Sequence, residues 1–168
     1  MRLNKKGFTL VELLAVIVVL AIIMIIAIPA VVESMNNAKK GSFKIYAEKA
    51  LGNAQSTYSS EDLLDTISSG HQIKDESGNI LCYCYPLADI GLKNSGSYSG
   101  YVVVKLDNKR EASYYVTLTD KSYHVKNGTY ANLGESIGEG NGGVSATCPM
   151  SASTCNVTQA AQDNQGQS

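Results

Sequence analysis

One uninterrupted apolar segment near the N-terminus constrains this chain more than any other feature. Leu13–Ile28 comprises 16 consecutive apolar residues. As a single helix, residues 8–32 would be roughly 37 Å long, which is enough to cross the ~30 Å hydrocarbon core of a bilayer. Three basic residues precede the segment: Arg2, Lys5 and Lys6. Because positive charges favour the cytoplasmic side, the pattern predicts a membrane-spanning helix whose N-terminus is cytoplasmic.

A carboxylate near the start of this helix requires a partner. Glu12 would lie in its first turn and a half, and an ionised side chain inside a bilayer is functional by default. If the chain were cut after Gly7, Phe8 would carry a new α-ammonium group four residues before Glu12. That amine, from the same chain or a neighbour, could neutralise the carboxylate. The alternative is a glutamate tolerated beside the lipid headgroups.

The segment Lys5-Lys6-Gly7-Phe8-Thr9-Leu10-Val11-Glu12-Leu13 resembles the class III signal of type IV prepilins and their pseudopilin relatives. The shared features are a short basic leader, a glycine at the cut site, a phenylalanine after it and a glutamate shortly beyond. Pro29 also stands where the family has a proline. The close resemblance covers roughly residues 5–32, and a weaker architectural one extends through the rest of the chain.

This resemblance implies a role for each residue of the motif. Gly7 would precede the bond cut by a prepilin peptidase, and the same enzyme would N-methylate Phe8. Glu12 would pair with the α-amine of an adjacent subunit. The implied partners are further copies of the chain, other pilins, the peptidase/methyltransferase, an inner-membrane assembly platform and the lipid bilayer. The implied location is the cytoplasmic membrane for the single-pass precursor, and then a filament on the cell surface.

Pro29 perturbs the predicted helix. A proline in a helix interior removes one backbone hydrogen bond and costs about 3 kcal/mol. One interpretation is a simple kink at Pro29. The other is local melting of this neighbourhood on assembly, which would let the helix stretch within a filament.

Beyond Val32 the helix is predicted to continue to about Tyr58 with an amphipathic pattern. Aromatic and small residues recur at spacings of three and four: Phe43, Tyr46, Ala47, Ala50, Ala54 and Tyr58. This face is predicted to pack on a β-sheet, and a helix lying on a lipid surface is the alternative.

The remainder predicts a small antiparallel head. Four segments have strand character: Ile80–Tyr85, Tyr98–Leu106, Ala112–Thr119 and Ser122–Lys126. The predicted fold is therefore α+β and type IV pilin-like, with one long N-terminal helix on a small sheet. Five parts are expected along the chain: a cleaved leader over 1–7, a transmembrane and assembly helix over 8–32, an amphipathic helix half over 33–58, a β-rich head over 59–134 and a flexible tail over 135–168.

Four cysteines occur in the head and tail: Cys82, Cys84, Cys148 and Cys155. An even number in an exported domain suggests disulfides. Cys82 and Cys84 point the same way on one strand, so their direct pairing would need distortion. A Cys148–Cys155 loop, two cross-pairings and free thiols all stay open. The spacings fit a zinc site poorly, and no metal or cofactor is expected.

No residue constellation indicates an enzyme. His71 and His124 look isolated, and Glu61 with Asp62 looks like the solvated start of a helix. The formal charge of −1 offers no basic face for nucleic acid. The sequence therefore predicts a non-enzymatic pilin of a type IV pilus or similar filament. The alternatives are a pseudopilin of a type II secretion or competence DNA-uptake system, or a membrane-tethered binding module that never assembles.

Overall fold

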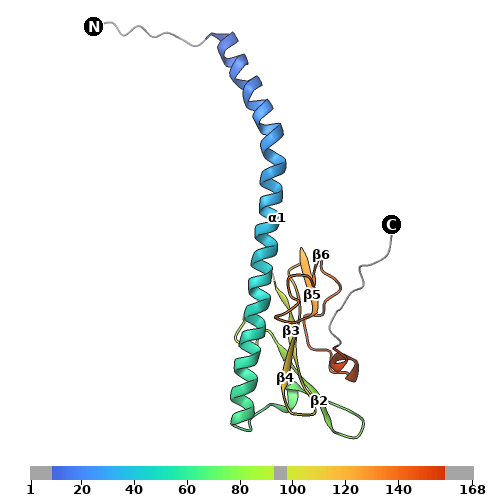
Figure 1. Ribbon diagram of the computed structural model, residues 1–168. Helices are drawn as coiled ribbons and strands as arrows, with labels where there is room; N and C mark the ends of the chain where they lie inside the picture. The colour runs from blue at the N-terminus through green and yellow to red at the C-terminus, as the bar shows by residue number, and fades with distance from the viewer. Residues whose placement is uncertain (1–8, 93–97, 158–168) are drawn as a thin grey trace, which may run out of the picture. The chain divides into compact units, whose positions relative to one another are not determined.

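The computed structural model describes residues 9–92 and 98–157. The elements follow in this order (Figure 1): α1 (Leu10–Leu63), η1 (Ser69–His71), β1 (Gln72–Lys74), β2 (Ile80–Pro86), β3 (Ser99–Leu106), β4 (Ala112–Thr119), β5 (Tyr123–Gly128), β6 (Ile137–Glu139) and η2 (Ala152–Cys155). One long helix and a six-stranded antiparallel sheet confirm the predicted α+β class. The chain divides into two compact units between Lys39 and Lys40, and each is described by itself.

In the first unit, the described residues form the N-terminal part of α1. The helix passes through Pro29 without interruption. All described residues of this unit are exposed, and Ile25 and Ile26 each have 74% of their surface accessible. By length and composition, α1 could cross a membrane. Its apolar side chains cover all sides, which is typical of a helix that lies in lipid or among other helices.

The second unit packs the C-terminal part of α1 on the sheet. The strand order is β1-β2-β3-β4-β5-β6, so every strand pairs with its neighbour in sequence. The predicted helix face is confirmed, because Phe43, Ala47, Ala50 and Ala54 are fully buried in the main hydrophobic core with Tyr58 at its edge. Valine and leucine side chains from β3 and β4 cover this helix face.

The sheet has two strands more than the sequence predicts. The four predicted segments correspond to β2, β3, β4 and β5, with ends that differ by at most two residues. The strands β1 and β6 are additional, and each has three residues. Ile73 is the one buried residue of β1, and Ile137 is the one buried residue of β6. Such short strands carry no alternating pattern that a sequence could reveal.

The helix ends later than predicted. α1 continues past Tyr58 to Leu63, so Glu61 and Asp62 lie in its last turn and do not begin a helix. Asp65 adopts a left-handed backbone conformation with φ 53°. Around it, the Thr66 amide donates to the Glu61 carbonyl and the Asp65 amide to the Asp62 carbonyl. This is a Schellman motif, in which an aspartate takes the position that glycine usually occupies.

The segment predicted to be a flexible tail is also different over residues 135–157. It contains β6 and η2, and it buries Ile137, Cys155 and Val157. The Gly- and Ser-rich composition of this segment does not predict the burial of these three residues or the two disulfide bonds that attach the segment to β2. The prediction for residues 158–168 falls outside the described residues.

Candidate functional site

The first described residues form a hydrogen-bonded cap on α1. The Thr9 amide and the Thr9 hydroxyl both donate to Glu12 Oε2, each at 2.9 Å. In return, the Glu12 amide donates to Thr9 Oγ1 at 3.3 Å. Thr9 is therefore the N-cap and Glu12 the third helical residue of a capping box. The Thr-x-x-Glu spacing is visible in the sequence and could have predicted this cap.

The capping box changes the interpretation of Glu12. The sequence predicts a carboxylate that lacks a partner until the leader is removed, yet Thr9 satisfies Oε2 without any cleavage. A carboxylate offers about four lone-pair sites, and the box uses only one oxygen. Oε1 lies outside the box and retains acceptor capacity for a further donor. The other predicted residues of this site, Gly7 and Phe8, lie outside the described residues.

The surface that follows this cap is apolar on all sides. The accessible fraction is 79% for Leu10 and 50% for Leu20, and large aliphatic side chains continue to Val32. A contiguous apolar surface of this size is a protein–protein or membrane interaction site in a folded chain. This helix surface can move from lipid into contact with neighbouring helices at little cost in free energy, because lipid tails and apolar side chains are equally apolar.

The four cysteines form two cross-linked pairs in the structure. Cys82 bonds to Cys155 and Cys84 to Cys148, with Cα–Cα distances of 5.6 and 6.0 Å. Both bonds leave the same face of β2, where they pack with Ile73 in a second hydrophobic cluster. They attach the C-terminal segment to the sheet face that points away from α1.

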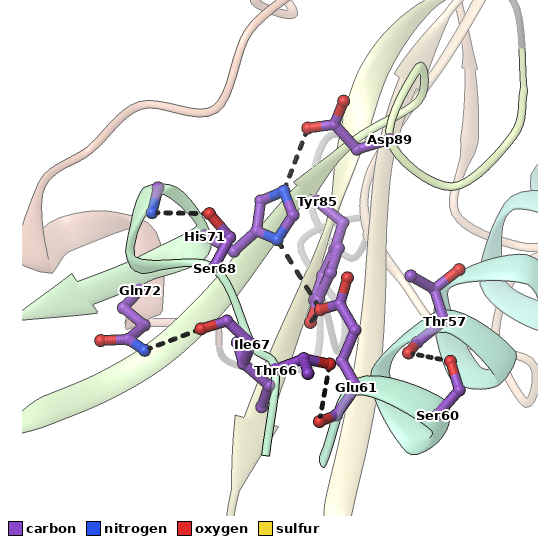
Figure 2. A network of polar contacts seen from close by, with 11 residues as sticks. Thr57, Ser60, Glu61, Thr66, Ile67, Ser68, His71, Gln72, Tyr85 and Asp89 are labelled. Atoms are coloured by element: carbon purple, nitrogen blue, oxygen red, sulfur yellow. Dashed lines mark hydrogen bonds and ion pairs between the residues drawn. The ribbon is translucent and has the colours of Figure 1, made fainter. Parts of the chain in front are cut away.

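A polar cluster joins the end of α1 to the sheet (Figure 2). His71 Nε2 lies 3.0 Å from Asp89 Oδ2, and His71 Nδ1 lies 3.8 Å from Glu61 Oε2. The Tyr85 hydroxyl donates to Glu61 Oε2 at 2.8 Å, and its ring centroid is 4.4 Å from that of His71. His71 is thus not the isolated residue that the sequence predicts. The residues of this cluster come from three segments that are distant in the sequence. No spacing of residues in the sequence therefore predicts the cluster.

The cluster has the chemistry of a structural junction. Burial, reinforced by the hydrogen bond to the Glu61 carboxylate, raises the pKa of the fully buried Tyr85. The phenol therefore stays protonated and donates throughout the physiological range. His71 Nδ1 is buried and makes no hydrogen bond, so a proton on this nitrogen would face the Glu61 carboxylate. In Figure 2 the marked contacts of the imidazole go to the carboxylates of Asp89 and Glu61.

Comparison with known proteins locates a match at the N-terminal end of the chain. Residues 2–28 match the family model described as the prokaryotic N-terminal methylation motif, which is the class III signal of type IV prepilins. This finding confirms the resemblance of the N-terminal segment to the signal of type IV prepilins. The chain matches neither a curated protein nor a solved structure.

Proposed function

We propose that this protein is a structural subunit of a type IV pilus or a similar filament. The observation that carries the proposal is a methylation motif that opens directly into a helix with apolar, exposed side chains on all sides. A prepilin-type motif implies processing by a peptidase and assembly with other pilins. The same helix would first anchor the precursor in the membrane and then pack against its neighbours in the fibre.

Cleavage would occur between Gly7 and Phe8, and Phe8 would become the methylated N-terminus. Glu12 would then have two partners. The Thr9 cap would hold Oε2, as in the structure, and the ammonium group of an adjacent subunit would bind Oε1. Because the cap fixes the carboxylate on the first turn, the neighbouring amine would meet an acceptor that is already oriented. The net gain depends on how far the ion pair offsets its own desolvation.

A first experiment tests whether the precursor is processed. Mass spectrometry of the protein from its native membrane should find a chain that begins at methylated Phe8. If the leader ending at Gly7 remains on every molecule, the filament assignment fails and a membrane-tethered module is supported.

A second experiment separates the charge of Glu12 from its capping role. Glu12→Gln keeps a capping box, because glutamine also caps at this position, but it removes the negative charge. Thr9→Val removes the hydroxyl of the cap and keeps the charge. We expect Glu12→Gln to insert normally and lose most of its filament yield, and Thr9→Val to retain most of its yield. Equal yields from Glu12→Gln and the wild type would refute the proposed ion pair.

A further inference from the structure

A cleft lies on the sheet face opposite the C-terminal part of α1. It has a volume of about 270 Å³, close to the lower end of the range for small-molecule sites, roughly 300–1,000 Å³. Its floor comes from three adjacent strands, with Tyr101 on β3, Thr117 on β4 and Asn127 on β5. The outer wall of the cleft is the C-terminal segment between residues 143 and 156. The cleft lies entirely within the second unit.

A β-bulge builds the floor of this cleft. Tyr101 pairs directly with Thr117, but the pairing of β4 with β5 shifts there, so that two residues of β5 oppose one residue of β4. Asn127 is the second of these two and has a left-handed backbone conformation, with φ 52°. Its amide donates to Thr117 Oγ1 at 3.2 Å. Bulges of this kind redirect a side chain and are frequent beside functional sites.

The residues that line the cleft are mostly uncharged. Six of the eleven described lining residues have hydroxyl or carboxamide side chains: Thr117, Asn127, Ser145, Ser153, Thr154 and Asn156. Lys126 is the only charged residue among the described residues that line the cleft. Tyr101 contributes an aromatic ring, and burial raises the pKa of its phenol, which therefore remains a hydrogen-bond donor at neutral pH.

We propose that this cleft binds a saccharide unit that carries a carboxylate. Sugar hydroxyl groups both donate and accept, and the carboxamides and hydroxyls of the lining do the same. The apolar face of a sugar ring fits an aromatic side chain such as Tyr101. Lys126 supplies a point charge for the carboxylate, and no acidic side chain of the lining opposes it.

Two other ligand classes fit the cleft less well. An apolar ligand would leave the hydroxyl and carboxamide groups of the lining without partners, which costs free energy. An inorganic anion is usually held by an arginine fork or by several amide groups at a helix N-terminus, whereas this cleft offers a single lysine. The abundance of neutral hydrogen-bonding groups is better matched to a polyhydroxylated ring than to a compact anion.

The disulfides hold the outer wall of the cleft in place. Pro149, Ser153 and Thr154 line the cleft and lie between Cys148 and Cys155 in the sequence. Both cysteines are bonded to β2, so each end of this short loop is fixed to the sheet. Saccharide binding should therefore require the oxidised protein. The proposal is independent of whether the chain assembles into a filament.

The test uses the full-length chain in detergent micelles and ligand-observed saturation-transfer NMR. Glucuronate should bind saturably, and glucose, its neutral analogue, should bind more weakly. Lys126→Gln should weaken glucuronate binding by about two- to five-fold, the range for an exposed ion pair, and leave glucose unchanged. Asn156→Ala should weaken both sugars. Lys109→Gln is the matched control, because Lys109 is exposed in the β3–β4 turn outside the cleft, and it should change neither affinity.

Four results would overturn the proposal or part of it. Absence of saturable glucuronate binding would overturn it outright. Displacement of glucuronate by equimolar acetate or phosphate would indicate a simple anion site. Binding that survives both Lys126→Gln and Asn156→Ala would place the saccharide elsewhere. Binding that persists after both disulfides are reduced with dithiothreitol would refute the role of the covalently held wall.

Discussion

The two disulfides should stabilise the head in a strongly coupled way. Cys84–Cys148 lies inside the loop that Cys82–Cys155 closes, with sequence separations of 64 and 73. In the chain-entropy model, either bond alone would raise the free energy of unfolding by about 4.3–4.4 kcal/mol. When one bond is present, however, the second closes only the short segments between the cysteines. These are two residues from Cys82 to Cys84 and seven from Cys148 to Cys155.

Closing a ring of about nine residues contributes about 2.6 kcal/mol in the same model. Removing either bond by paired substitution, Cys82→Ala with Cys155→Ala or Cys84→Ala with Cys148→Ala, should therefore cost about 2.6 kcal/mol. Removing both should cost about 7 kcal/mol, which is more than the sum of the two single losses. That amount is comparable to the whole stability of many domains.

Urea unfolding of the full-length chain in micelles, followed by near-UV circular dichroism of tyrosine, measures these losses. Each paired variant should lower the midpoint by about 0.9–2.6 M, because urea m-values are about 1–3 kcal/mol/M. Under dithiothreitol the variants and the wild type should become equal, which controls for packing lost with the sulfur atoms. Losses near 4.4 kcal/mol from each single bond would refute the nested-loop argument.

Two further substitutions test the junction and the sheet. Tyr85→Phe removes a buried hydrogen bond to a carboxylate and should cost about 1.5–3 kcal/mol in urea unfolding, whereas Tyr130→Phe, whose hydroxyl is exposed and bonds a carbonyl, should cost less than about 1 kcal/mol. Gly100→Ala should cost about 2–4 kcal/mol, because its Cβ would collide with the β4 backbone, whereas Gly78→Ala shares the positive φ in open space and should cost about 1 kcal/mol. Equal losses within either pair would refute the contacts assigned to Tyr85 or Gly100.

The features that the sequence predicts correctly are those with a regular spacing. Phe43, Ala47 and Ala54 follow the helical period, and Val102 and Val104 of β3 follow the strand period, so the pattern predicts their burial in one core. The N-terminal motif is readable because its residue types are contiguous. The end of α1 was misjudged because Asp65, and not a glycine, terminates it.

The features that the sequence does not predict depend on contacts between distant segments. Glu61, His71 and Asp89 come from a helix end, a 3-10 turn and a loop after β2, and only the fold places them together. The cysteine spacing allowed three connectivities. The direction of the side chains on β2 disfavours a Cys82–Cys84 bond, but it does not decide between a Cys148–Cys155 loop and the two cross-pairings. The bulge at Asn127 depends on a register shift between two strands, and its one local mark is the Asn127-Gly128 pair, a dipeptide that is more typical of turns.

The two faces of the sheet are stabilised in different ways. The inner face, with Val102 and Val104, supports the C-terminal part of α1 mainly by apolar burial, and the hydrogen bond from Tyr85 to Glu61 adds a polar contact. The outer face carries the C-terminal segment, whose small polar residues bury little apolar surface. The disulfide bonds at Cys148 and Cys155 therefore hold this segment on the sheet where apolar packing is insufficient. Substitutions in the outer wall should therefore alter what the head binds while the helix-bearing core stays intact. The proposed filament assembly through the N-terminal helix and the proposed ligand binding at the cleft would then vary separately, because they rely on different surfaces and different forces.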